Sequence, residues 1–465
     1  MRKLIPLLAM SIFLCGCPRK AQYSRPALPV PSAWPESSAG PAPAPGTPAA
    51  VDIKWQEFFT DQRLQSVIEL CLANNRDLRV ATLNIEKVQA LYRIQRAEQY
   101  PIIAASASAD AYRVPKNMSG KDHAETVAQF TVGLGTASWE LDLFGRIRSL
   151  KSLALEQYLA TEQARSATQI SLVASVAGTY LALAADRENL RLAQVTLDAQ
   201  QASYQLILRT SQVGMASDLD LRQAQTQVDA ARVDIARYSG QVALDENALN
   251  LLVGTPVTPG MLPDDLGQVR ALKDVAAGLP SDVLLRRPDI LAAEHQLKAA
   301  YANIGAARAA FFPRISLTAA AGIISSDLTN LFKPAAGTWN LAPQAALPIF
   351  DYGARQAGFK AAEVDRDMAV AEYEKAIQAA FREVSDALTL RTTLVAQQNA
   401  LQSLVNSLEE TYRLSEARYK GGIDSYLSVL VAQRSLYAAQ QQLVGVRLAR
   451  LGNLVTLYKV LGGGA

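Results

Sequence analysis

The segment GMASDLDLRQAQ at residues 214–225 resembles GIDSYLSVLVAQ at residues 422–433, which lies 208 positions later. Both copies place glycine first, serine fourth, leucine sixth and Ala-Gln last. The same offset aligns Gly254 with Gly462 and Gly145 with Gly353. Self-similarity over so long a distance indicates an internal twofold repeat.

Long stretches without proline surround both copies of this motif. No proline occurs between Lys116 and Thr255, or from Ile349 to the end of the chain. The composition predicts helices over residues 146–209 and 218–253 in the first half, and 355–420 and 425–461 in the second. A helix of about 65 residues is roughly 95 Å long, so each half predicts a helical hairpin far longer than a globular domain.

Alternating segments precede each hairpin. Residues 102–114, 126–139, 314–324 and 337–347 place apolar side chains at every second position, opposite serine, threonine, asparagine, glutamine and glycine. This alternation predicts four strands with one apolar side, as in a membrane barrel with a wet lumen. Any one of these strands alone could equally belong to a soluble sandwich. Trp139 and Trp339 lie at strand ends, where aromatic residues meet the membrane boundary.

The start of the chain is typical of an exported lipoprotein. Residues 1–16 resemble a signal peptide, and Leu14-Cys15-Gly16-Cys17 resembles a lipobox that leaves a lipid on Cys17. Pro18, rather than aspartate, follows the cysteine, which favours the outer membrane. Residues 17–56 are rich in proline, alanine and serine and predict an extended tether.

Composition excludes several other classes. The net charge of +3 indicates no nucleic-acid binding surface. Two of the three cysteines lie in the first 17 residues, so the chain has no disulfide framework. The two histidines, His123 and His295, support no metal site, and Cys71 is expected to be a buried packing residue. We expect no enzyme and no cofactor other than the lipid on Cys17.

Four strands are too few for a barrel, because the smallest single-chain membrane barrels have about eight. Past Cys17 no uninterrupted apolar run of 18 residues occurs, so no membrane-spanning helix is expected. We therefore predict an α+β membrane protein. Three copies would share a twelve-stranded β-barrel, continued by a twelve-helix α-barrel.

The predicted organisation has five parts. These are a signal peptide (1–16), a lipidated tether (17–56), a first repeat (57–256), a connector (257–287) and a second repeat (288–465).

Several motifs resemble those of the NodT-type outer-membrane factors, which are relatives of OprM and TolC. They are LPSDVLLRRPDI at 279–290, FFP at 311–313, LPIF at 347–350, AQRSL at 432–436 and LYKVLGGG at 457–464. The resemblance covers essentially the whole mature chain. It implies a homotrimer in the outer membrane of a Gram-negative bacterium, reaching into the periplasm. There it would dock through a periplasmic adaptor, a membrane fusion protein, onto an inner-membrane transporter of the RND type and act as the exit duct of an efflux pump.

The resemblance also implies a gate at the periplasmic tip of the hairpins. Its contacts would come from Arg418, Tyr419 and Arg434, with Leu427 as an apolar constriction. The alternative is a solvated hairpin end, where exposed charges are ordinary and contribute little. Val431 stands where a related pattern has aspartate, so Asp218 and Asp220 are alternative sources of charge. Gly214, Gly421 and Gly422 are expected to turn the hairpins with positive backbone angles and to lie near adaptor contacts.

Two other functions remain open. One is a duct for type I protein secretion, which differs in its partner. The other is a lipid-anchored periplasmic tether without a pore, which the four alternating segments disfavour.

Overall fold

The computed structural model describes residues 23–35, 50–269 and 283–464, which form two compact units. The first unit contains residues 85–161 and 293–373 together with the start of the chain, and it holds a four-stranded sheet. The second contains residues 27–84, 162–292 and 374–465. The predicted signal peptide and Cys17 lie outside the described residues, as does much of the predicted tether.

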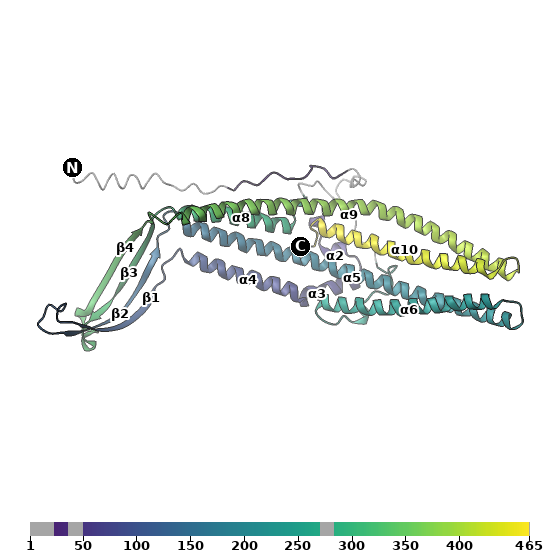
Figure 1. The fold of residues 1–465 in the computed structure, drawn as a ribbon, viewed down its shortest axis with the longest axis horizontal. Helices are drawn as coiled ribbons and strands as arrows, with labels where there is room; N and C mark the ends of the chain where they lie inside the picture. The colour runs from purple at the N-terminus through teal and green to yellow at the C-terminus, as the bar shows by residue number, and fades with distance from the viewer. Residues whose placement is uncertain (1–22, 36–49, 270–282, 465) are drawn as a thin grey trace. The chain divides into compact units, whose positions relative to one another are not determined.

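The strands are β1 (Ala104–Val114), β2 (Glu125–Glu140), β3 (Arg314–Ser325) and β4 (Gly337–Ala346). They form one antiparallel sheet in the order β1-β2-β3-β4 (Figure 1), so β1 and β4 are its edges. Their bounds differ by two residues or fewer from the segments in which the sequence predicts strands.

The strand register places the apolar sides of all four strands on one face of the sheet. Ala107 pairs with Val132, and Val132 pairs with Ile323. Paired residues share a face, so the apolar face is continuous: Ala105, Ala107, Ala109, Ala111, Ala128, Phe130, Val132, Leu134, Ile315, Leu317, Ala319, Ala321, Ile323, Trp339, Leu341, Pro343 and Ala345. The other face carries Ser106, Ser108, Asp110, Gln129, Thr131, Ser316, Thr318, Asn340 and Gln344.

A β-bulge interrupts β2 near its end. Thr136 pairs with Ala319 and Trp139 with Leu317, so β2 holds one extra residue there, and Ser138 adopts a φ of 55°. Without the bulge, Trp139 would lie on the polar face. The extra residue returns this large side chain to the apolar face of the sheet.

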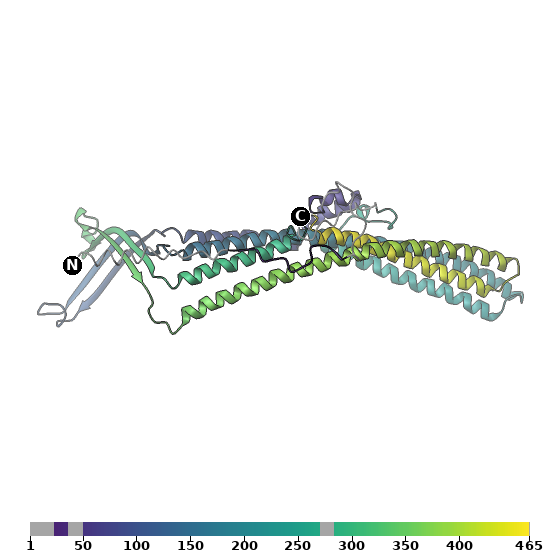
Figure 2. The same ribbon diagram turned by 90° about the horizontal axis from the view of Figure 1, so that it is seen from above.

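Two helices of 67 residues dominate the chain: α5 (Arg146–Gln212) and α9 (Ala354–Lys420), each about 100 Å long. Each begins a hairpin, with α6 (Asp218–Val253) beside α5 and α10 (Tyr426–Val460) beside α9 (Figures 1 and 2). The shorter α4 (Arg76–Ala97) and α8 (Pro288–Ala309) precede the two strand pairs. Both halves thus have the same order: helix, two strands, long helix, helix.

The remaining elements within the described residues are short. They are η2 (Ala50–Asp52), α2 (Trp55–Phe58), α3 (Gln62–Asn74), η3 (Pro259–Met261), η4 (Leu328–Asn330) and η5 (Pro334–Ala336).

The hairpin turns use one glycine each in the left-handed region. Gly214 has a φ of 76° and Gly422 a φ of 70°. The prediction that Gly421 also has a positive angle is wrong, because its N–H still donates to the Ala417 carbonyl at 3.0 Å as the last helical hydrogen bond of α9. The chain therefore reverses at Gly422 alone.

The hydrophobic core of the second unit lies where α5 meets α2, α3 and the end of α10. Val176, Tyr180 and Leu181 of α5 are fully buried there, and the Phe58 and Tyr458 rings stack at 4.0 Å. An 18-residue window of α5 has a mean hydropathy of 1.4, enough for a membrane span, although none was expected. Half of that window is buried inside the protein, so its apolar character is explained by this core.

Candidate pore gate and membrane-facing surface

The turn of the second hairpin is closed by an ion pair. The Arg418 guanidinium contacts the Asp424 carboxylate at 2.6 Å and 3.1 Å, which raises the pKa of Arg418 and lowers that of Asp424. Both side chains are partly exposed. Arg418 was expected to make contacts at the tip, and within one chain its partner is the carboxylate across its own turn.

An aromatic and aliphatic cluster joins the two hairpins near these turns. Ile207 of α5, Ala224 of α6 and Tyr426 of α10 are buried together with Val429 and Leu430, and we call these five residues the tip cluster. Tyr419 packs against it, with its ring centroid 5.4 Å from that of Tyr426. Burial raises the pKa of Tyr426 to about 12. Tyr419 is thus held by packing, and Tyr426 is a structural residue that the sequence analysis did not single out.

Leu427, Val431 and Arg434 form an exposed stripe along α10. Their spacing of four and three residues places them on one side of the helix, and Leu427 and Val431 are 53% and 56% exposed. Arg434 is also exposed and forms no ion pair with any residue that the structure describes. A single chain therefore leaves this side of α10 uncovered.

The two candidate acids after the first turn differ. The Asp220 carboxylate accepts hydrogen bonds from the Ser217 hydroxyl at 2.7 Å and the Ser217 N–H at 3.1 Å, and so caps α6. Asp218 is exposed and accepts no such bond within the described part of the chain. Of the two, only Asp218 keeps its carboxylate free for another group, and Asp220 is occupied by its own helix.

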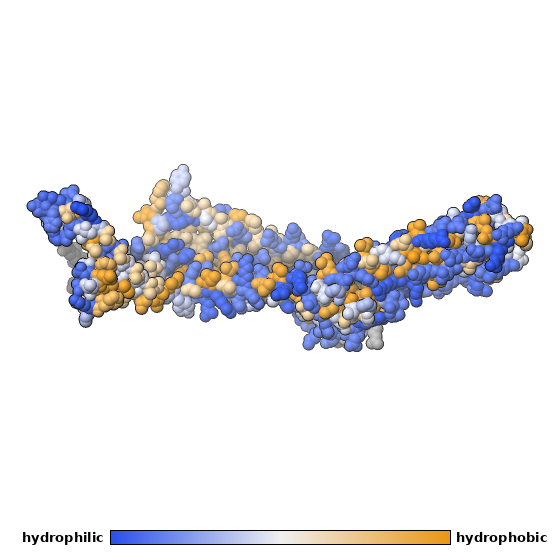
Figure 3. Space-filling model, turned by 90° about the horizontal axis from the view of Figure 1, so that it is seen from below, coloured by the Kyte–Doolittle hydropathy of each residue, from blue (hydrophilic) through white to orange (hydrophobic). Residues whose placement is uncertain are grey.

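Large apolar side chains are exposed at every junction between a strand and a helix of the first unit. They are Tyr100, Ile102 and Ile103 before β1, Leu143 after β2, Phe311 before β3, and Leu347, Ile349, Phe350 and Tyr352 after β4. Ile349 and Tyr352 are each 93% exposed. Figure 3 shows hydrophobic residues gathered near the ends of the strands. Such residues are typical of the boundary between lipid and water.

The start of the chain is held against α8. The Arg25 guanidinium contacts the Glu294 carboxylate at 2.7 Å, and the Tyr23 hydroxyl donates to it at 2.9 Å. Lys298 lies 3.1 Å from the same carboxylate, whose side chain is only 3% exposed. In the second unit, the Trp34 ring stacks on Phe381 at 4.9 Å. The predicted tether is extended, but residues 23–35 make specific contacts and are not a free linker.

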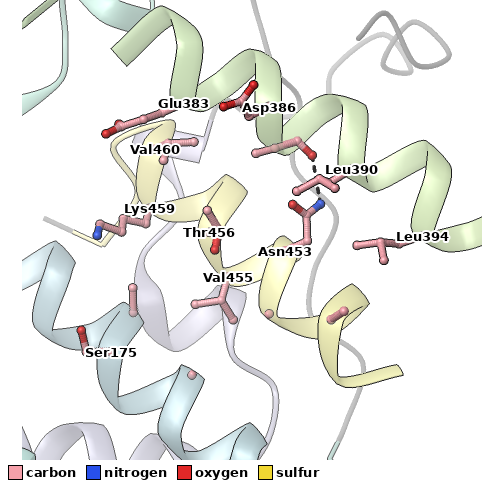
Figure 4. Close-up of a pocket in the computed structure, with 15 residues that line it drawn as sticks. Ser175, Glu383, Asp386, Leu390, Leu394, Asn453, Val455, Thr456, Lys459 and Val460 are labelled. Atoms are coloured by element: carbon pink, nitrogen blue, oxygen red, sulfur yellow. Dashed lines mark hydrogen bonds between the residues drawn. The ribbon is translucent and has the colours of Figure 1, made fainter. Parts of the chain in front are cut away.

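A cavity of about 670 Å³ lies between α5, α9 and α10 (Figure 4). Gly178 and Gly452 line it, and the Asn453 amide donates to the Ala387 carbonyl at 2.9 Å beside it. Glu383, Asp386 and Lys459 also line the cavity (Figure 4). Its lining contains neither histidine nor cysteine, so it offers no thiol nucleophile or imidazole base.

The residues that could have served metal or thiol chemistry have structural partners. The His295 ring lies 2.7 Å from Glu156, and Cys71 is buried with its thiol 3.2 Å from the Leu252 carbonyl. Burial raises the pKa of Cys71 to about 12, so its thiol is not a nucleophile near neutral pH. Among the described residues, no group of three or more His, Cys, Asp or Glu side chains could hold a metal ion.

Three relatives place the chain among known proteins. An antibiotic efflux pump outer membrane protein of Pseudomonas putida, ArpC, is 48% identical over 100% of this chain and 96% of its own. A solved membrane protein of Pseudomonas aeruginosa is 40% identical, with a TM-score of 0.90 over 96% of this chain and 100% of that one. The open state of the Neisseria gonorrhoeae MtrE outer membrane channel is 37% identical, with a TM-score of 0.87 over 95% and 97%.

The sequence profile of one family matches residues 67–255 and 279–463, which together span both halves of the chain. The fold, the one-sided sheet and the relatives agree with that match, and the chain belongs to the outer membrane efflux protein family.

Proposed function

We propose that three copies of this chain pool their strands into one barrel in the outer membrane of a Gram-negative bacterium. The observation that carries this proposal is a sheet with one apolar face and two edges, β1 and β4, that no other described strand covers. Unpaired backbone groups cost several kcal/mol each in lipid. Each edge therefore needs a strand from another copy, and three copies supply twelve strands.

Exposed apolar residues along the helices support the same assembly. Val80, Leu83, Leu91 and Ile94 on α4 are 51–65% exposed, and they recur at intervals that keep them on one side of the helix. Leu390, Leu404 and Leu414 on α9 are 46–48% exposed. Neighbouring copies would bury these side chains and complete a tunnel of twelve helices from four per chain. The matched element order of the two halves supports an origin by duplication.

Such a tunnel is a passive exit duct for small molecules, including antibiotics, and performs no chemistry itself. The export energy would come from an inner-membrane transporter of the RND type, joined to the duct by a periplasmic adaptor near Gly214 and Gly422. The exposed stripe of Leu427, Val431 and Arg434, with the free carboxylate of Asp218, would meet neighbouring copies and hold the tip closed. Val431 contributes no charge, so the closure would depend on Arg434, on Asp218 and on apolar contact.

A lipid on Cys17 would fix the same end of the chain to the membrane. Tyr23 is the first described residue and follows Cys17 by six positions, a distance of at most about 20 Å. The contacts of Tyr23 and Arg25 with Glu294 on α8 would therefore hold the lipid close to the helices that lead to the strands. Mass spectrometry of the N-terminal peptide of the wild type and of Cys17→Ala tests for the lipid: only the wild type should carry the added mass.

The test of the duct is single-channel conductance of the purified protein in planar bilayers. We expect small, rare openings for the wild type and larger or more frequent openings for Arg434→Ala. Arg382→Ala, which removes an exposed arginine of α9 far from the turn, is the matched control and should behave as the wild type. Tyr419→Phe keeps the ring against Tyr426 and removes only the hydroxyl, so it separates packing from polar contacts.

If neither the wild type nor any variant conducts, the proposed duct is wrong and the alternative of a periplasmic tether without a pore remains. The mass of the detergent-solubilised particle gives the copy number independently, and a monomer or dimer would contradict the shared barrel. A type I secretion duct would conduct in the same way. It would be distinguished by loss of a secreted protein, rather than of drug export, when the chain is deleted.

A further inference from the structure

A group of polar side chains lies between α5 and α6, away from the hairpin turns and from the sheet. Asp186 and Asn189 are three residues apart on α5, and Gln241 and Asp245 are four residues apart on α6. These spacings place each pair on one side of its helix. Asn189 and Asp245 are each only 9% exposed. Asn189 and Asp245 therefore lie where apolar residues would be expected, whereas Asp186 is half-buried and Gln241 is exposed.

The group contains more acceptors than donors. The Gln241 amide donates to Asp245 Oδ1 at 3.1 Å, but Asp245 Oδ2 and Asn189 Oδ1 are buried and have no hydrogen-bond partner among the described residues. The contact of Arg187 with Glu246 at 2.7 Å places this turn of α5 beside Asp245 of α6, and both Asp245 and Asn189 influence the pKa of Asp186. Two ionised carboxylates are acceptors only and cannot bond each other. Something that carries positive charge is needed between them.

The neighbouring cations have other partners. Arg237, which faces Asp186 from α6, contacts Asp234 at 2.9 Å, and Asp234 also accepts from the Tyr437 hydroxyl of α10 at 3.0 Å. Arg187 of α5 contacts Glu246 at 2.7 Å. The adjacent Glu188 contacts Arg447 of α10 at 2.7 Å, and Tyr238 is the remaining titratable group nearby. No side chain in this list satisfies the two free oxygens.

We propose that Asp186, Asn189 and Asp245 form a binding site for a hard divalent cation such as Mg²⁺ or Ca²⁺. One or two carboxylates, a carboxamide oxygen and water molecules are the ligands that these ions prefer. The three residues supply this set, and the unpartnered oxygens of Asn189 and Asp245 are the acceptors that the ion would satisfy. Because the ligands come from both α5 and α6, the ion would fasten the first hairpin along its length.

A proton is the competing occupant. Burial, followed by the hydrogen bond and the charge of Asp245, raises the pKa of Asp186 to about 6. In mildly acidic solution one carboxyl can therefore keep its proton and donate to the other. At neutral pH the proton is lost and the site becomes available to the cation. Cation binding should accordingly weaken as the pH falls.

The experiment is thermal unfolding of the full-length purified protein after treatment with EDTA, at pH 7.5 and constant ionic strength. We expect MgCl₂ or CaCl₂ to raise the Tm by a few degrees in a saturable way, and more cation to be needed for the same rise at pH 5. Asp245→Asn should abolish the response while retaining hydrogen-bonding capacity. Asp229→Asn removes an exposed carboxylate of α6 that pairs with Arg232, outside the site, and should retain the response, which also controls for cations bound by residual lipid.

Asp186→Asn provides a second variant in case Asp245→Asn does not fold, with circular dichroism and particle mass as checks. Calorimetric titration of calcium should give one site per chain in the wild type and none in either variant. No response of the wild type at pH 7.5 would overturn the site, as would a response that both variants keep. A Tm that depends on pH but not on the cation would show that the carboxyls hold a proton alone, which also overturns it.

Discussion

The guanidinium of Arg25 lies 2.7 Å from the carboxylate of Glu294, although 269 residues separate them in the chain. The Glu294 side chain is 3% exposed, whereas that of Arg25 is 45% exposed. The hydrogen bonds of Arg25, Lys298 and Tyr23 hold the pKa of Glu294 below its usual range, although burial opposes this. The start of the chain therefore completes the environment of a buried charge.

Arg25→Ala should lower the free energy of unfolding by about 1–3 kcal/mol, because it removes a partner from a buried carboxylate while water can partly replace an exposed guanidinium. Urea unfolding of the purified protein measures this. In the background of Glu294→Gln the same substitution should cost much less, since no charge remains to be paired. Equal costs in the two backgrounds would show that Arg25 acts only through packing.

The contacts of Arg25 mark the limit of what the sequence predicts. The helices and strands lie within three residues of their predicted bounds, because glycine, proline and alternation are local signals. The segment 23–35 was expected to be a free tether, since nothing near Arg25 indicates a partner so distant in sequence. The bulge at Thr136–Trp139 and the capping role of Asp220 likewise depend on neighbours in space. At the tip, the sequence identified the turn but not the tip cluster around Tyr426.

Strands β2 and β3 lie so close together that two glycines on the polar face of the sheet cannot be replaced by larger residues. A Cβ added at Gly322 would collide with the backbone of Val132 and Gly133, and one at Gly135 would lie 2.5 Å from the Ala319 carbonyl oxygen. Gly322→Ala should therefore force the two strands apart and reduce the amount of protein assembled in the outer membrane. Quantitative immunoblotting of membrane fractions checks this.

Gly337→Ala is the matched control for the strand substitution. It also lies in the sheet, but the nearest atom to its added Cβ is the Pro334 carbonyl oxygen at 3.8 Å. It should assemble at the wild-type level. Equal assembly of Gly322→Ala and Gly337→Ala would contradict the steric argument.

Mutation should distinguish the roles of the two acids after the first turn. Asp220→Ala removes the capping box of α6 and should cost about 1 kcal/mol of stability. Asp218→Ala should leave stability within about 0.5 kcal/mol, since its carboxylate accepts no hydrogen bond among the described residues. If Asp218 supplies charge at the closed tip, its variant should instead increase the conductance. The reverse assignment would be shown by a stability loss in Asp218→Ala and none in Asp220→Ala.

The carboxyl pair of Asp186 and Asp245 predicts a stability that depends on pH when divalent cations are absent. The folded-state pKa of Asp186 is raised from 3.8 to about 6, chiefly by burial and then by Asp245. A raised pKa means that the native state holds the proton more tightly than the unfolded chain does, so the contribution is complete below the unfolded value. It is lost as the pH rises from about 4 through about 6.

With EDTA present, the wild-type Tm should therefore fall over this interval relative to Asp186→Asn, whose amide does not titrate. A constant difference in Tm between the two proteins from pH 4 to pH 7 would show that Asp186 titrates alike in the native and unfolded states, and that burial of this carboxyl has no energetic consequence.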